Sequence, residues 1–337
     1  MLFRSLAGMQ LSENQLHAAA KTYRDVLQQL SDPSHSVACE AHLGLARICY
    51  EWNDLNAAES HARQSSKLAA PMESGAGLSA DAMAARVLQQ RNRFTEAGAL
   101  LAQAATAAQT RRFTSRLEEI TGLQVQDLLR RGELAAALEL AQRHNIAVPT
   151  ARALLAQGHA DQALPLLAAY RSQMDAAGRA DESLKAMVVQ ALALHVLGKL
   201  QEALQVLHEA LLLAEPGGLI RTFVDEGQPM AALLTALSDR GTLPDYTARL
   251  LAVWGASQPP GVDSAHLQRI GVEALSEREL DILRLIQQGQ SNQGIGETLF
   301  LSLHTVKWHN QNIYDKLQGK RRTEAVARAL SLKLLPA

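Results

Sequence analysis

The order of apolar and polar positions over residues 275–320 predicts three short helices in succession. Apolar residues recur there at intervals of three, four or seven, as they do along one face of a helix: Leu280, Leu283 and Ile286, then Ile295 and Leu299, then Val306, Ile313 and Leu317. Ser276-Glu-Arg-Glu279 fits the capping box that opens a helix, and Gly289 fits a helix stop. Ser302 opens the third helix only three residues after Leu299, and so tight a turn predicts a helix-turn-helix.

Polar residues on the third of these helices suit a nucleic-acid surface. At about 100° per residue, four of them point away from the apolar stripe of that helix: His304, Lys307, Trp308 and Gln311. Side chains of these types, exposed in the first turns of a helix, contact phosphates and base edges in the major groove. For Trp308 the alternative is packing against a neighbouring helix.

Upstream of residue 215, a short unit of the form Leu-x-x-Ala recurs with small variations. The units begin at Leu16, Leu55, Phe94, Leu134, Ala160 and Leu200, and the intervals between the alanines that close them are 39, 39, 40, 26 and 40 residues. Several units follow a turn, such as Asn53-Asp54 or Gly198-Lys199, and amphipathic segments lie on either side. Alanine at a crossing lets two helices approach closely, so the pattern predicts stacked helical hairpins.

These units resemble tetratricopeptide repeats, although their spacing is nearer 40 residues than the usual value of about 34, and most of the usual aromatic positions are missing. We therefore expect an all-α fold, with a TPR-like superhelix of helical hairpins followed by the helix-turn-helix. The alternative is an Ala-rich helical bundle without true repeats. The repeats are expected to bind a small effector or a protein partner, at residues that the pattern does not identify, or else to form a scaffold for dimer contacts.

Residues 216–271 are predicted to form a helical linker between the repeats and the C-terminal helices. Glu215-Pro-Gly-Gly218 ends the repeats, two helical stretches lie near residues 230–237 and 244–254, and Gln258-Pro-Pro-Gly261 has the Pro and Gly density of a connector. We interpret Asp225-Glu226, beside Gly227, as a solvated pair next to a hinge. The predicted domains are a repeat domain over residues 1–215, this linker, and a helix-turn-helix domain over residues 272–337.

Charge is distributed unevenly along a chain whose net charge is only −1. Residues 276–337 hold nine Lys and Arg against six Asp and Glu, a balance of +3, while the remainder holds 24 against 28, a balance of −4. A basic patch on a nearly neutral protein is the electrostatic footprint of a phosphate-binding module. The charge pattern thus favours double-stranded DNA as the partner of the C-terminal helices.

The composition is typical of a helical protein of the cytoplasm. Aromatic residues make up only 4% of the chain, no run of eighteen apolar residues occurs, and no signal peptide opens it, so we expect no membrane contact. Cys39 and Cys49 fit small buried residues in a reducing compartment. No Cys-x-x-Cys, His-Glu-x-x-His or Gly-x-Ser-x-Gly pattern occurs. We therefore predict no catalytic residue, no metal ligand, no cofactor and no enzymatic activity.

The C-terminal residues also resemble the LuxR-type DNA-binding domain. The matching stretches are Leu275-Ser-Glu-Arg-Glu279, Gly289-Gln-Ser-Asn292, Leu301-Ser302, Thr305-Val-Lys-Trp-His309, Lys316-Leu317 and Arg322-Thr-Glu-Ala-Val326. The resemblance implies that the third helix enters the major groove and that a fourth, over about residues 323–334, pairs two copies into a homodimer on DNA. Two departures from the family are Gly294-Ile-Gly296 and Gln318-Gly319. They lower the expected stability, since a glycine inside a helix costs roughly 0.5–1 kcal/mol relative to alanine.

By the same resemblance, the predicted site consists of base-facing and phosphate-contacting residues. The base-facing residues are His304, Lys307, Trp308 and Gln311. The phosphate-contacting residues are Ser291, Asn292, Thr305, Lys316, Lys320, Arg321 and Arg322. For Arg322 the alternative is a structural role that ties the fourth helix to the rest of the domain.

Arg221-Thr-Phe-Val-Asp-Glu-Gly227 resembles the segment between the helical sensor and the LuxR-type domain in large MalT-like regulators. The resemblance implies a small effector or a protein partner at the repeats, and RNA polymerase as a further partner. The Gly-x-x-x-x-Gly-Lys-Ser/Thr loop of the NTPase domain with which such regulators usually begin is absent from this sequence. We therefore expect either a truncated relative or a fragment of a longer protein.

Two functions fit this sequence. The first is a sequence-specific, DNA-binding transcriptional regulator whose helical repeats sense an effector or partner. The second is a protein-interaction adaptor, or a competitor of full-length relatives, in which the glycines of the second helix leave DNA binding weak or vestigial. DNA binding by the isolated segment 262–337 distinguishes the two.

Overall fold

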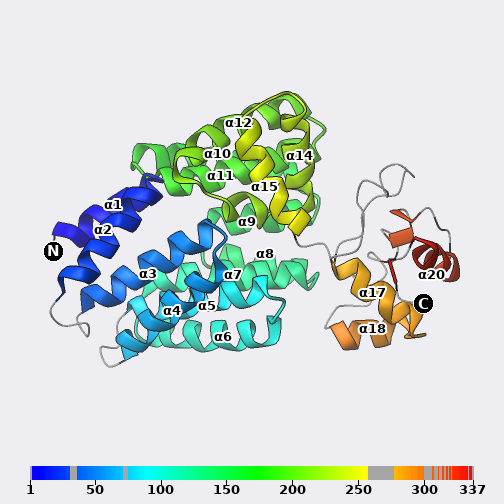
Figure 1. The fold of residues 1–337 in the computed structure, drawn as a ribbon, viewed down its shortest axis with the longest axis horizontal. Helices are drawn as coiled ribbons and strands as arrows, with labels where there is room; N and C mark the ends of the chain where they lie inside the picture. The colour runs from blue at the N-terminus through cyan, green and yellow to red at the C-terminus, as the bar shows by residue number, and fades with distance from the viewer. Residues whose placement is uncertain are drawn as a thin grey trace. The chain divides into compact units, whose positions relative to one another are not determined.

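The computed structural model describes residues 2–30, 36–70, 75–256 and 277–299, and after these residues 306, 310, 313, 314, 316, 317, 319, 321–332, 334 and 335 (Figure 1). All regular structure among them is helical, with no strand, which confirms the predicted all-α fold. The chain divides into two compact units, one over residues 1–129 and 134–251 and the other over residues 130–133 and 252–337.

Six helical hairpins form most of the first unit. Their helices are α1 (Leu2–Ser12), α2 (Leu16–Gln29), α3 (Ser36–Glu51), α4 (Leu55–Ala69), α5 (Gly75–Gln90), α6 (Phe94–Thr110), α7 (Thr114–Arg130), α8 (Leu134–Arg143), α9 (Ala147–Ala156), α10 (Ala160–Ala176), α11 (Ala180–Val196) and α12 (Leu200–Ala214). The second helix of every hairpin begins at the first residue of a predicted unit. The closing alanines are fully buried: Ala19, Ala58, Ala97, Ala137, Ala163 and Ala203. The predicted stack of TPR-like hairpins is confirmed.

The same backbone turn leads into the second helix of each hairpin. Two residues before that helix, φ lies between 59° and 84° at Asn14, Asn53, Asn92, Gly132, Gly158 and Gly198. Asparagine and glycine adopt this left-handed region more readily than other residues. A Cβ at Gly158 or Gly198 would meet no atom within 4 Å, so the backbone angle, and not crowding, favours glycine there.

The interval of 26 residues between the fourth and fifth units reflects two short helices. Both α8 and α9 have 10 residues, whereas α4 to α7 have between 15 and 17. The crossings are kept although the helices shorten, because Ala137 and Ala163 remain fully buried. The repeat is therefore defined by its crossing and its turn, and not by its length.

Neighbouring hairpins bury apolar surface against one another. Successive clusters join α5, α6 and α7, then α7, α8 and α9, then α9, α10 and α11. Each cluster therefore spans two hairpins, as expected of repeats that cannot bury an apolar face alone. Cys39 and Cys49 of α3 are buried, and no disulfide joins cysteines in the described part of the chain, as predicted.

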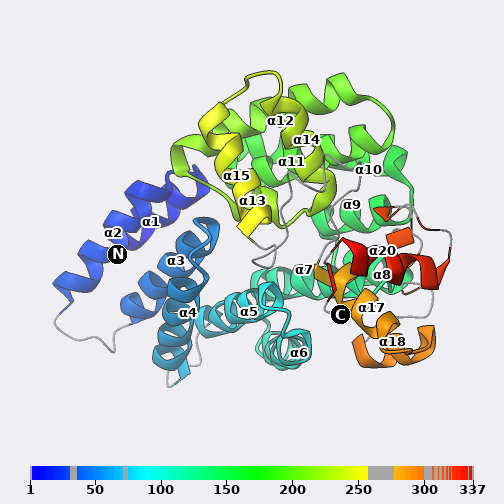
Figure 2. The same ribbon diagram turned by 45° about the vertical axis from the view of Figure 1, so that its right-hand side comes forward.

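After the last hairpin the chain continues into short helices of the same region. They are η2 (Glu215–Gly217), α13 (Arg221–Val224), α14 (Gln228–Ser238) and α15 (Pro244–Ala256). Helix α14 packs on α12, and α13 contacts both α3 and α11. Figure 2 shows α13 and α14 grouped with α15. The rings of Phe223 and Tyr246 meet edge to face, with 6.4 Å between their centroids. The predicted connector Gln258-Pro-Pro-Gly261 lies outside the described residues, and the division into three domains stays a prediction.

The interpretation of Asp225 and Glu226 as a solvated pair is wrong. Their side chains are only 8% and 9% exposed, and both form ion pairs with arginines of the repeats. The physical reason is that α13 lies against the first helices of the hairpins and brings both carboxylates to cationic partners there, which a buried charge requires. Gly227, beside them, has a φ of 75°, a left-handed backbone angle that favours glycine.

The second unit is a small helical domain whose described residues share one apolar cluster. Its helices are α17 (Glu277–Gln287), α18 (Asn292–Leu299) and α20 (Arg322–Ser331). Between α18 and α20, the chain is helical at Val306, Asn310, Ile313, Tyr314 and Lys316. The cluster contains every apolar position predicted for the three helices except Leu299, whose side chain lies outside the described residues, and it adds Ile282, Ala325, Ala329, Leu334 and Leu335. The predicted cap Ser276 also lies outside the described residues.

Candidate nucleic-acid interface

All residues predicted to face bases lie outside the described residues: His304, Lys307, Trp308 and Gln311. Thr305 and Lys320, predicted to contact phosphate, lie outside them as well. The structure describes the other predicted phosphate contacts: Ser291, Asn292, Lys316, Arg321 and Arg322. Their surroundings distinguish side chains that hold the domain together from side chains that stand at its surface.

Asn292 joins the second, third and fourth helices of the domain. Its Oδ1 accepts hydrogen bonds from Asn310 Nδ2 at 2.9 Å and from Arg322 Nη1 at 3.3 Å. The other terminal nitrogen of Arg322 donates to the carbonyl oxygen of Gln290. Arg322 thus ties α20 to the start of α18, as the alternative, structural role for this residue requires.

The sequence pattern did not single out Asn310, the third member of this group. It lies four residues after Val306 and three before Ile313, so it occupies a position on the apolar stripe of the third helix, and it is only 5% exposed. Its Oδ1 is buried without a hydrogen-bond partner in the structure. A polar residue in the register of a core stripe is the sequence signal that identifies such a position.

Lys316 forms an ion pair inside the domain. Its Nζ lies 2.8 Å from Oε2 of Glu279, and the two side chains are 21% and 5% exposed. Because a carboxylate this buried requires a cation, Lys316 fixes the third helix to α17. A phosphate contact by the same amine has to use a second of its three donor hydrogens.

Ser291 and Arg321 stand at helix starts. Ser291 Oγ accepts a hydrogen bond of 3.1 Å from the N–H of Gly294 and so caps α18. A Cβ at Gly294 would meet the flexible end of Gln290, with Oε1 at 2.6 Å. This departure from the family therefore lowers helix propensity, and close packing does not require a glycine there. Arg321 precedes α20 and is exposed, whereas Lys316 and Arg322 are half-buried.

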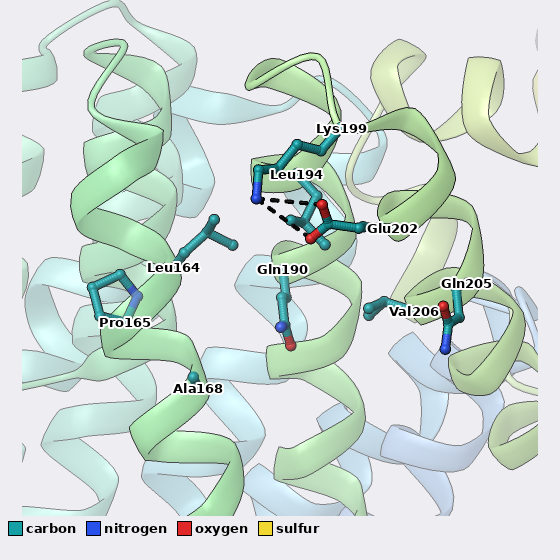
Figure 3. Close-up of a pocket in the computed structure, with 9 residues that line it drawn as sticks. All are labelled: Leu164, Pro165, Ala168, Gln190, Leu194, Lys199, Glu202, Gln205 and Val206. Atoms are coloured by element: carbon teal, nitrogen blue, oxygen red, sulfur yellow. Dashed lines mark hydrogen bonds and ion pairs between the residues drawn. The ribbon is translucent and has the colours of Figure 1, made fainter.

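A groove on the first unit is a candidate surface for an effector. Figure 3 shows α10 and α12 on either side of it and α11 between them; its volume is about 420 Å³. The residues that line it are Leu164, Pro165, Ala168, Gln190, Leu194, Lys199, Glu202, Gln205 and Val206. Lys199 Nζ and Glu202 Oε1 lie 3.3 Å apart, and Gln190 Oε1 is buried without a partner in the structure.

Polar residues of the first helices of the hairpins form a second surface. Arg47 Nη2 of α3 and Ser79 Oγ of α5 each donate a hydrogen bond of 2.6 Å to Glu119 of α7. Burial alone would raise the pKa of Glu119, but Arg47 and Ser79 outweigh it and hold that pKa below its usual value. In α11, Lys185 is the main reason that the pKa of Glu182 falls to about 2. Arg47 and Glu119 are thus paired across hairpins, whereas Glu182 and Lys185 are paired within one helix.

Among the described helices, none combines the length and the apolarity needed to cross a membrane.

Comparison with known proteins assigns both units. Residues 1–240 match the family model of the MalT-like TPR region, and residues 273–329 match that of the bacterial regulatory proteins of the luxR family. Over 154 residues the chain is 34% identical to the HTH-type transcriptional regulator MalT of Klebsiella pneumoniae and 33% identical to that of Cronobacter sakazakii. Each alignment covers 40% of this chain and 17% of the relative.

A second kind of relative matches the C-terminal region alone. Over 57 residues the chain is 49% identical to the transcriptional regulatory protein LiaR of Bacillus subtilis, which covers 17% of this chain and 27% of the relative. The chain thus corresponds to a minor part of the length of each of these relatives. Because the first family model extends over residues 1–240 of 337, the chain belongs to the family of proteins with a MalT-like TPR region, and it carries a luxR-family regulatory domain at residues 273–329.

Proposed function

We propose that this protein is a cytoplasmic transcriptional regulator that binds double-stranded DNA through residues 273–329 and senses an effector or a protein partner through its repeats. The observation that carries the proposal is the luxR-family match over a domain whose helices share the apolar cluster predicted for a helix-turn-helix. The relatives named above are transcriptional regulators as well. The third helix would then enter the major groove, as recognition helices do.

The proposed site has three kinds of residue. His304, Lys307, Trp308 and Gln311 face bases, while Ser291, Thr305, Lys320 and Arg321 contact phosphates. Asn292, Lys316 and Arg322 act mainly by positioning, because each already has a partner inside the domain. Asn292→Ala should therefore weaken binding to every sequence and also loosen the packing of α20.

A homodimer on paired half-sites completes the proposal. Helix α20 buries Ala325 and Ala329 on one face and exposes Thr323, Ala327 and Ser331 on another. An exposed face with small residues allows a second copy of the helix to approach closely. RNA polymerase is the further partner that a regulator of transcription requires.

The experiment that tests the proposal is a fluorescence anisotropy titration of the whole protein with random and with selected duplex DNA over a range of salt concentrations. We expect the affinity to fall steeply as salt rises. The slope of log affinity against log salt concentration should be about −0.9 for each phosphate that the protein neutralises. Because a lysine at this place on the recognition helix also meets a phosphate, Lys307→Ala should weaken binding to all sequences and reduce that slope by about 1. Gln311→Ala should instead relax preference at one base pair, by roughly 1–3 kcal/mol. Equal losses for Gln311→Ala on random and selected DNA would contradict its base-reading role.

A further inference from the structure

Residues 217–227, which we name the latch segment, bind the beginning of the repeats through backbone groups. The carbonyl oxygen of Gly217 accepts a hydrogen bond of 2.9 Å from Trp52 Nε1, and the N–H of Ile220 donates to the carbonyl oxygen of Glu51 at 2.8 Å. Glu51 Oε2 also accepts from the N–H and from the hydroxyl of Thr222, each at 2.9 Å. A segment that follows the last hairpin is thus held like a bound peptide by the end of α3.

Asp225 forms the first of two charged contacts of the latch segment. Its Oδ2 accepts a hydrogen bond of 2.7 Å from the Tyr50 hydroxyl and lies 3.0 Å from Arg86 Nη2, while its Oδ1 lies 2.9 Å from Arg221 Nη2. The guanidinium of Arg86 also lies over the Tyr50 ring, 4.2 Å from its centroid. One carboxylate therefore gathers side chains from α3, α5 and α13.

Glu226 forms the second charged contact, with α9. Arg152 donates to it through Nε, at 3.1 Å, and through Nη2. The two acids together contact α3, α5 and α9, the first helices of three different hairpins. Stacking joins each hairpin mainly to its neighbours. The latch segment therefore adds contacts between parts of the array that stacking alone does not join.

The latch segment lies closely against the repeats, but some buried polar groups at this contact have no hydrogen-bond partner among the described residues. A Cβ at Gly217 would lie 2.4 Å from the carbonyl oxygen of Asn14, so the segment lies directly against the backbone. The Nε groups of Arg86 and Arg221 are buried without an acceptor in the structure. Because desolvating charges offsets much of what their pairing gains, the charged contacts of the latch segment are favourable by a narrow margin. A narrow margin is what a two-state element needs.

We propose that the latch segment is an exchangeable internal ligand of the repeats, and that its release changes the conformation of the array and thereby regulates DNA binding. The site it occupies accepts an acidic peptide, because Arg86, Arg152 and the Tyr50 hydroxyl all face carboxylates. A partner protein presenting two neighbouring acidic residues is therefore the kind of molecule that displaces it. The regulatory part of this proposal rests on the proposed function; the exchange does not.

The experiment uses a fluorescent peptide with the sequence of residues 219–227, titrated with the full chain. In the wild type the internal segment occupies the site, so only the small open fraction binds the peptide. The double substitution Asp225→Asn and Glu226→Gln weakens the internal ligand while leaving Tyr50, Arg86 and Arg152 in place. If it raises the open fraction from about 1% to about 10%, the peptide binds the variant roughly tenfold more tightly.

Matched controls make the result decisive. Glu139→Gln removes an exposed acid, paired with Arg143, and should leave peptide affinity at the wild-type value. A peptide carrying the same two amide substitutions should bind neither protein. Gly217→Ala displaces the internal segment by steric conflict without changing a charge, and should also increase peptide binding. Failure of the peptide to bind either displaced variant, with helical circular dichroism unchanged, overturns the exchange.

The regulatory part has its own measurement. The displaced variants should differ from the wild type in DNA affinity, and hydrogen exchange should increase in residues 217–227 and 36–51. Exchange that increases while DNA affinity stays constant overturns the regulatory role and leaves the internal ligand standing. Absence of DNA binding by the wild type and by every variant argues instead against the proposed function.

Discussion

The helix crossings of the repeats and the contacts of the latch segment join parts of one unit by opposite means. Each crossing is made by a small apolar residue, fully buried, between helices that are adjacent in sequence. The latch segment uses hydrogen bonds and ion pairs between residues 74 to 175 positions apart. A crossing requires only a small side chain at a periodic position, whereas the latch requires particular donors and acceptors in particular places. The first kind of contact therefore determines the fold, and the second fixes one conformation of it.

The largest expected effect is that of Asp225→Ala, which removes a charged contact of the latch segment. The substitution leaves Arg86 and Arg221 without their carboxylate, and removal of one partner of a buried ion pair costs about 3–5 kcal/mol. Because release of the latch segment limits this loss, we expect the free energy of unfolding in urea to fall by up to about 3 kcal/mol while helix content in the folded state is unchanged. Asp175→Ala, which removes an exposed partner of Arg171, should change stability by less than about 1 kcal/mol. Equal effects of the two would show that the latch contributes little.

A smaller effect is expected at the crossings. Ala97→Leu places three further carbon atoms where α6 crosses its partner helix, and overpacking of this kind costs about 1–3 kcal/mol. Ala102→Leu in the same helix is the control, because Ala102 is exposed and the helix propensities of alanine and leucine are similar. The difference between the urea midpoints of the two variants measures the cost of overpacking at the crossing alone. A crossing that tolerates leucine as well as the exposed position does would contradict the close approach of the helices.

The contrast also explains which features were predictable from the sequence. Crossings, turns and the apolar stripes of the C-terminal domain follow from local periodicity, so their positions were identified before the structure. The pairing of Asp225 with Tyr50 was not, because no local rule brings together residues 175 positions apart. Asn310, only 18 residues from its partner Asn292, was missed for a different reason: its place as a polar residue on the apolar stripe of the third helix was not singled out. Polar contacts over long distances in sequence depend on the completed fold.

Substitutions at the turns test the contacts that are local in sequence, one by a loss of stability and one by a gain. Gly198→Ala introduces a Cβ at a φ of 76°, with open space around it, so the cost is that of the backbone alone, about 1–2 kcal/mol. Arg112→Gly should have the opposite effect and stabilise by up to about 1 kcal/mol, because Arg112 has a φ of 57° without being glycine or asparagine. Thermal unfolding of both variants measures these changes. A gain in stability from Gly198→Ala would contradict the role of the turn.

The smallest effect concerns a polar contact that is local in sequence, between α3 and α4. His42 Nδ1 and His61 Nδ1 lie 2.9 Å apart, so one ring donates and the other accepts while both are neutral. Burial lowers the pKa of each ring below 6.5, assisted by His61 at His42 and by Arg24 at His61, whereas Asp54 acts in the opposite direction at His61.

A histidine whose pKa is lowered by folding takes up its proton more readily in the unfolded chain. The stability contributed by the pair is therefore complete above pH 6.5 and is lost as the pH falls from 6.5 towards the lowered values. We expect the urea midpoint of the wild type to decrease over this range and that of His42→Gln to decrease less. His159→Gln, at an exposed histidine, should keep the wild-type profile. If His42→Gln kept it too, the pair would not be a source of the pH dependence, and this polar contact would add nothing to the packing of α3 on α4.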